Sequence, residues 1–114
     1  MGKFTVSIPA GPIWNDEDGK EKGPIVAAAH LGEFDGNWRT VVPNQMSTVD
    51  VILDSEQTGS SEYTTDVLAG PIWNQEDAEK KCPVVCASYG GTWNGQWKTV
   101  VSGKMSVCGC TFKF

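Results

Sequence analysis

Short runs of alternating apolar and polar residues predict strands at matching places in the two halves of the chain. Phe4–Ile8 alternates with a period of two residues, and Tyr63–Val67 does so more weakly. This alternation places successive side chains on opposite faces of a sheet, so each half is predicted to begin with a strand. Two further runs in each half, separated by a short turn, predict a hairpin. The hairpin strands are residues 37–42 with 46–53, and residues 96–101 with 105–114.

A helix is predicted between the first strand and the hairpin of each half. In the first half Asn15 lies where an N-cap is expected, and Asp18 follows three residues later as a capping-box partner. The helix should end near Gly32, since glycine commonly terminates helices. An internal proline removes one backbone hydrogen bond and clashes with the preceding turn. A kink or a restart is therefore expected at Pro24 and at Pro83 in the second half.

The two halves are a tandem duplication. The hexapeptide AGPIWN at residues 10–15 recurs unchanged at residues 69–74, 59 positions later, and further identities follow at the same offset without a gap. Each half is therefore predicted to be a small strand-helix-strand-strand unit of the α+β class, with the helix packed on an antiparallel or mixed sheet. The predicted repeats are residues 1–54 and 63–114, joined by the polar linker 55–62.

Size and charge narrow the classes of function. A repeat of about 55 residues is near the lower limit for an independent core, so the halves are expected to pack on each other or on a second chain. The net charge is −5 and no basic cluster occurs, which argues against nucleic acid or an anionic membrane as a partner. No apolar run approaches the ~20 residues of a membrane span, and no export signal is predicted at the N-terminus.

All four cysteines lie in the second half. Cys82 and Cys86 would share one face of a helix, and Cys108 and Cys110 would share one face of a strand. The two pairs can therefore face each other where the helix covers the sheet, and the first half has small and apolar residues in the same columns. Two disulfides are the favoured interpretation. A four-thiolate zinc site is the less favoured alternative, because the spacing of the two strand cysteines differs from that of a zinc knuckle. Disulfides would suit an oxidising compartment, whereas no export signal is predicted, so the localisation stays open.

The tryptophans are the strongest candidates for chemistry. The chain has five, and four of them form the repeat pairs Trp14 with Trp73 and Trp38 with Trp97. Core packing is the commonest use of a tryptophan, but these lie in turns and in polar, glycine-rich segments. An aromatic ring beside amide, hydroxyl and carboxylate groups suits a sugar, whose C–H faces stack on the ring while its hydroxyls accept and donate hydrogen bonds.

A catalytic interpretation has to rest on carboxylates. Glu76 and Asp77 lie near a tryptophan-bearing turn and are weak candidates for the two carboxyl groups of a glycoside hydrolase. Their place at a predicted helix start is explained equally well by the helix dipole and capping. No catalytic residue, cofactor or metal site is therefore predicted.

The repeated motifs resemble those of the MVL-type mannan-binding lectins. These motifs are the two AGPIWN turns, AAAH or CASY at the helix end, G-x-W-x-T-V-V and M-S-V, and the resemblance extends over nearly the whole chain. It implies a duplicated α+β fold, a homodimer, and one carbohydrate site in each repeat. The implied ligands are oligomannose N-glycans, bound at their Man-GlcNAc-GlcNAc core without calcium.

The resemblance also implies which residues form each site. The first site would consist of Gly11, Pro12, Trp14, Asn15, Gly36, Asn37, Trp38, Arg39 and Thr40. The second would consist of Gly70, Pro71, Trp73, Asn74, Gly95, Gln96, Trp97, Lys98 and Thr99. The chain departs from the family pattern in its four cysteines and in Asn15 and Asn74, where serine is usual. The lectin hypothesis has two alternatives. One is a weak glycoside hydrolase acting on GlcNAc oligomers, and the other is a structural or inhibitor protein that binds no sugar.

Overall fold

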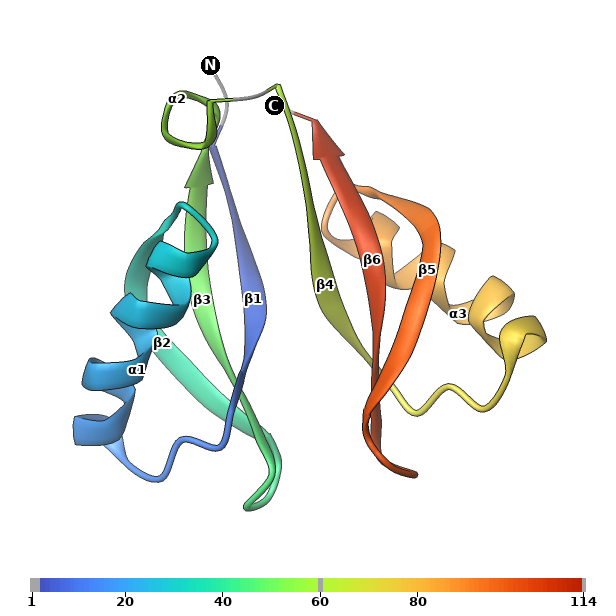
Figure 1. The fold of residues 1–114 in the computed structure, drawn as a ribbon, viewed down its shortest axis with the longest axis horizontal. Coiled ribbons are helices and arrows are strands. Elements are labelled where there is room, and N and C mark those ends of the chain that lie inside the picture. The colour runs from blue at the N-terminus through green and yellow to red at the C-terminus, as the bar shows by residue number, and fades with distance from the viewer. Residues whose placement is uncertain (1–2, 60, 114) are drawn as a thin grey trace. The chain divides into compact units, whose positions relative to one another are not determined.

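The computed structural model describes residues 3–59 and 61–113, which divide into two compact units between Ser61 and Glu62. In the first unit the elements are β1 (Lys3–Gly11), α1 (Asp16–Ala29), β2 (Glu33–Val42) and β3 (Met46–Asp54). The strands form an antiparallel sheet in the order β1-β3-β2, and α1 lies across one of its faces (Figure 1).

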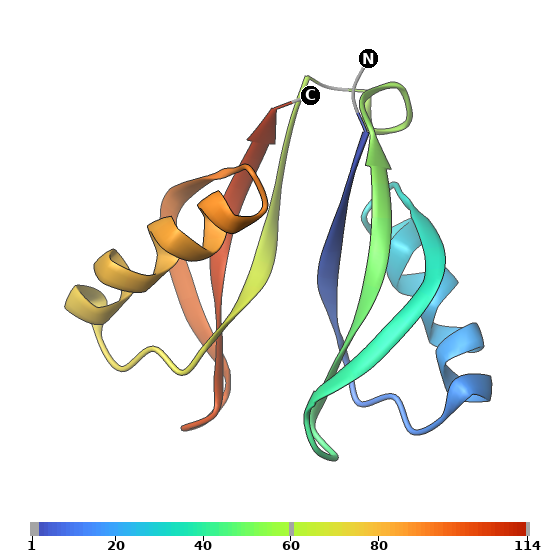
Figure 2. The ribbon, with the colours of Figure 1, turned by 180° about the vertical axis from the view of Figure 1, so that it is seen from behind.

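The second unit repeats this arrangement with β4 (Glu62–Gly70), α3 (Gln75–Ser88), β5 (Thr92–Val101) and β6 (Met105–Lys113). Its sheet has the order β4-β6-β5, again antiparallel, with α3 against one face (Figure 2). The predicted α+β class and β-α-β-β unit are confirmed, and the sheet is antiparallel rather than mixed. No helix within the described residues is long and apolar enough to cross a membrane.

The core of each unit lies between its helix and the central strand of its sheet. In the first unit the side chains of Val6, Ile8, Val49, Val51 and Leu53 are at most 1% exposed. The predicted linker 55–62 contains a single helical turn, α2 (Ser55–Thr58), which Asp54 caps through a hydrogen bond from the Glu56 N–H.

The hairpin begins earlier than predicted. β2 starts at Glu33 and β5 at Thr92, whereas the sequence predicted starts at residues 37 and 96. The polar, glycine-rich segment between Phe34 and Trp38 is a β-bulge, because these two residues pair with Val51 and Val49, which are only two positions apart on β3. Gly36 provides the positive φ of 97° that the bulge requires.

The expected restart of the helices at their prolines is wrong. α1 runs unbroken through Pro24, and α3 does the same at Pro83. The hydrogen bond that Pro24 cannot make would have reached the carbonyl of Lys20, which is an exposed residue. Water can satisfy such a carbonyl, so the proline is tolerated on the solvent side of the helix.

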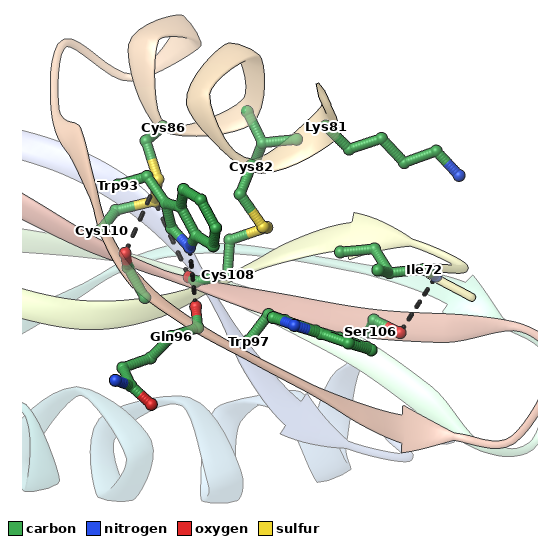
Figure 3. The surroundings of a disulfide bond; sticks show 12 residues. Ile72, Lys81, Cys82, Cys86, Trp93, Gln96, Trp97, Ser106, Cys108 and Cys110 are labelled. Carbon is green, nitrogen blue, oxygen red and sulfur yellow. Dashed lines mark hydrogen bonds between the residues drawn. A yellow bond between two sulfur atoms is a disulfide. The ribbon is translucent and has the colours of Figure 1, made fainter. Parts of the chain in front are cut away.

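Two disulfides tie α3 to the central strand β6 in the second unit (Figure 3). Cys82 is bonded to Cys108 and Cys86 to Cys110, with Cα–Cα distances of 5.5 and 5.4 Å. All four side chains are fully buried. The prediction of two disulfides is confirmed and the zinc alternative is wrong, because every thiol is already bonded.

Candidate functional site

The turn that leads into each helix is held at nearly every residue. In the first repeat the Gly11 N–H points to Met46 Sδ at 3.3 Å, and the Pro12 carbonyl accepts a hydrogen bond from Lys22 Nζ at 2.8 Å. Ile13 is buried and its N–H donates to Ser47 Oγ at 3.1 Å. The second repeat has the same contacts at 3.2, 2.8 and 3.2 Å. The backbone that carries Trp14 and Trp73 is therefore fixed.

The start of each helix is capped as the sequence predicted. Asn15 Oδ1 accepts a hydrogen bond from the Asp18 N–H at 2.8 Å, and Asp18 Oδ2 accepts one from the Trp14 N–H at 3.1 Å. Asp18 also pairs with Lys22 at 3.0 Å. The Lys22 ammonium and the Trp14 N–H hold the pKa of Asp18 below its ordinary value of 3.8.

The tryptophans of these turns are exposed on a polar surface. The side chain of Trp14 is 58% exposed and that of Trp73 is 64% exposed. Burying an indole is strongly favourable, so a fixed backbone that holds one in solvent leaves its faces available for a ligand.

The second repeat pair of tryptophans, Trp38 and Trp97, lies at the end of the bulge, and each indole faces the start of the helix. Trp38 Nε1 donates a hydrogen bond to Asp16 Oδ1 at 2.9 Å, and Trp97 Nε1 donates one to Gln75 Oε1 at 2.8 Å. Gly19 leaves room for the Trp38 indole, since a Cβ at that position would lie 2.8 Å from the ring. Trp38 and Trp97 are partly buried and have their N–H groups occupied, so their ring surface is what they can offer.

A cleft of about 230 Å³ lies between the first two turns of α1 and the bulge of β2. Its lining combines an aromatic pair, a carboxylate, an ammonium group and a glycine, and consists of Asp16, Lys20, Phe34, Gly36 and Trp38. The same positions in the second repeat hold Gln75, Glu79, Trp93, Gly95 and Trp97. Polar groups that converge beside aromatic rings suit a small polar ligand with apolar faces.

Only some of the predicted residues line this cleft. Gly36 and Trp38 do, whereas Thr40 Oγ1 lies 3.2 Å from Ser47 Oγ and so links the hairpin to the turn. In the second repeat Thr99 makes the same contact with Ser106 at 3.1 Å. Asn37 and Arg39 are exposed on the strand beside the cleft.

Three lining residues were missed by the sequence reasoning, namely Asp16, Lys20 and Phe34. Asp16 and Lys20 are four residues apart, a spacing that places both on one face of a helix. Phe34 stands in the column that holds Trp93 in the second repeat, and this repeated aromatic position was the signal that could have identified it.

The weak catalytic candidate Asp77 has a structural role. Its carboxylate pairs with Lys81 at 2.9 Å and accepts a hydrogen bond from the Trp73 N–H at 3.1 Å. These two partners lower its pKa, whereas the general acid of a glycosidase needs a raised one. In residues 3–59 and 61–113 no group of three or more His, Cys, Asp or Glu side chains could hold a metal ion.

The fold and the cleft define a small duplicated binding protein with tryptophan-containing polar sites. A family model described as "MVL: Mannan-binding protein" matches residues 75–110. The lectin MVL of Microcystis viridis is similar over its entire length, with 48% identity over 114 residues and complete coverage of both chains. The chain belongs to the MVL family of mannan-binding proteins.

Proposed function

We propose that this protein is a lectin that binds mannose-containing glycans, with one site in each repeat. The observation that carries the proposal is that one repeat holds both an exposed, backbone-fixed indole, Trp14, and a cleft lined by Trp38. Membership of a family described as mannan-binding supports the ligand class.

The cleft offers the groups that a sugar requires. Hexose C–H faces stack on indole rings, and hydroxyl groups bind to charged or amide side chains. In the first repeat Asp16 has a second carboxylate oxygen besides the one bonded to Trp38. The Lys20 ammonium has no hydrogen bond or ion pair within the described part of the chain, so it is available to a hydroxyl oxygen.

The proposed sites combine the predicted residues with those of the cleft. The bulge segment 36–40 is linked to the start of α1 by the Trp38–Asp16 hydrogen bond and to the turn 11–15 through Ser47, which contacts both Thr40 and the Ile13 N–H. The segments 70–74 and 95–99 have the same links at α3. The finer specificity for the Man-GlcNAc-GlcNAc core is also part of the proposal. Asn15 and Asn74 are engaged as helix caps, so their side chains contribute mainly by fixing the turn.

The test is the loss of one site at a time. Trp14→Ala and Trp73→Ala should each remove about half of the binding capacity for a Man-GlcNAc-GlcNAc oligosaccharide while leaving the fold intact, because both side chains are exposed. Binding is measured by titration of the intrinsic fluorescence, and folding by circular dichroism. Val100→Ala, which truncates another exposed side chain, is the matched control. Full capacity in both tryptophan variants would contradict the proposal.

A further inference from the structure

The two sites of the chain differ at one aromatic position. Phe34 pairs with Val51 on β3, and Trp93 pairs with Cys110 on β6. Residues directly opposite in an antiparallel pair share a face of the sheet, so both rings lie on the side of the helix.

The space behind these two rings is different. In the first repeat the Phe34 ring lies over Gly23, where a Cβ would be only 2.6 Å from it. In the second repeat the matching helix position is Cys82, which is bonded to Cys108 of the central strand. The disulfide fills the space that Phe34 uses, so Trp93 cannot take the same position.

Trp93 is instead bonded to its own bulge (Figure 3). Its Nε1–H donates to the Gln96 carbonyl at 2.8 Å, and Asn94 Oδ1 accepts from the Gln96 N–H at 2.9 Å. Both backbone groups of Gln96 are therefore held. In the first repeat Asp35 Oδ1 accepts a hydrogen bond from the Asn37 N–H at 2.9 Å. Phe34 has no donor that could bond the Asn37 carbonyl as Trp93 bonds that of Gln96.

The bulge of the second repeat is also fixed from the opposite face of the sheet. The Asn94 side chain lies against the backbone of Gly109, where a Cβ would be 2.5 Å from Asn94 Oδ1. The first repeat has Asp50 at this position, and its carboxylate accepts a hydrogen bond from Ser7. A more rigid bulge loses less conformational freedom when a ligand binds.

Trp93 and Trp97 have the spacing of neighbouring rings in a sugar chain. They pair with Cys110 and Cys108, which are two residues apart on β6 and point to the same face. Two residues along a strand correspond to roughly 7 Å. Phe34 and Trp38 have the same register on β3, but the Phe34 ring lies against Gly23 of the helix. Only the second repeat therefore places two indoles at this spacing, where they can stack on two successive sugar rings.

We propose that the two sites are unequal, and that Trp93, with its larger indole held by the bulge, gives the second repeat a better sugar-stacking position than Phe34 gives the first, and hence a higher affinity. This inference rests on the proposed lectin function. Gln75 and Glu79 also replace Asp16 and Lys20 in the second repeat, but these polar side chains add no ring surface. Trp93 is therefore the residue to which we assign the difference, and the preferred ligand of the second repeat is the longer oligosaccharide.

The experiment follows the indole N–H signals of the labelled full-length protein by NMR, with Trp38 reporting the first site and Trp97 the second. The ligand is a pentasaccharide made of the Man-GlcNAc-GlcNAc core and two further mannose residues. Trp97 should reach half-saturation at about a tenfold lower concentration than Trp38. With free N-acetylglucosamine, a single sugar ring that cannot stack on both indoles at once, the gap should narrow.

Trp93→Phe installs the residue of the first repeat and should bring the two half-saturation points to within about twofold, while Val100→Ala should leave them unchanged. Equal half-saturation in the unmodified protein would overturn this inference but keep the lectin function. A gap that persists in a folded Trp93→Phe variant would also overturn it. If neither indole shifts, the proposed function fails as well.

Discussion

At the scale of single residues, each member of the repeated hexapeptide has its own task. Gly11 adopts a φ of 72°, which ends the strand, and Ile13 is buried as an anchor. Asn15 caps the helix, so Trp14 between them is held in solvent at a fixed place. The indole that we propose as a sugar-stacking surface is thus positioned by a turn glycine, a buried anchor and a helix cap.

Gly23 is predicted to be required for the packing of Phe34. Alanine favours a helix by about 1 kcal/mol over glycine, but overpacking costs about 1–3 kcal/mol. Because a Cβ at this position would lie only 2.6 Å from the Phe34 ring, we expect Gly23→Ala to lower the free energy of unfolding by up to about 2 kcal/mol. Urea unfolding measures this. Ala28→Gly, at an exposed position of the same helix, measures how much the helix preference of alanine over glycine contributes to the free energy of unfolding. A Gly23→Ala protein more stable than the unmodified one would show that Phe34 does not need glycine at this position.

The capping aspartates should make stability depend on pH in acid. The folded pKa of Asp18 and Asp77 lies below the ordinary 3.8, so their stabilisation is fully present above that value and is lost as the pH falls through the folded pKa. The double variant Asp18→Asn with Asp77→Asn should be less stable than the unmodified protein at about pH 6. The difference in stability between the two proteins should shrink below pH 3.8. Urea unfolding at several pH values measures it, and a difference in midpoint that is the same at every pH would contradict the prediction.

At the scale of elements, periodicity was sufficient for the strands and helices but not for the bulges. The alternation in Phe4–Ile8 and the Asn15 cap identified their elements because each reflects a local preference. The segment around Gly36 has the composition of a loop, and only pairing with β3 makes it part of a strand. Proline normally ends a helix, and Pro24 is tolerated inside α1 because Lys20, whose carbonyl loses its hydrogen bond, is an exposed residue.

The disulfides should stabilise the second unit and not the first. Cys86→Ala with Cys110→Val installs the residues of the first repeat, Ala27 and Val51, and removes one disulfide. Closing a loop of this length contributes about 3 kcal/mol. Amide hydrogen exchange should therefore accelerate in Glu62–Lys113 and stay unchanged in residues 3–54. Equal acceleration in both units, or in neither, would contradict this prediction.

At the scale of the whole molecule, duplication gives one chain two copies of the proposed site. Single sugar sites are commonly weak, because polar hydroxyls must be desolvated, and a second linked site raises the apparent affinity for a branched glycan. The homodimer that the family resemblance implies would add two more sites and stays a prediction.

The candidate sites could be predicted only in part. Repetition of the AGPIWN turn singled out Trp14 and Trp73, and the polar surroundings of Trp38 and Trp97 made them candidates. Asp16, Lys20 and Phe34 were missed, since a cleft lining depends on how a helix lies against a bulge. No pattern along one segment contains that information.

The number of glycans bound per chain tests the central claim most directly. Isothermal titration of the unmodified protein with a soluble Man-GlcNAc-GlcNAc oligosaccharide should give two bound molecules per chain, because the turn, the cap and the bulge are built in both repeats. The absence of heat, or a stoichiometry of one per chain that does not change in Trp14→Ala or in Trp73→Ala, would contradict the account.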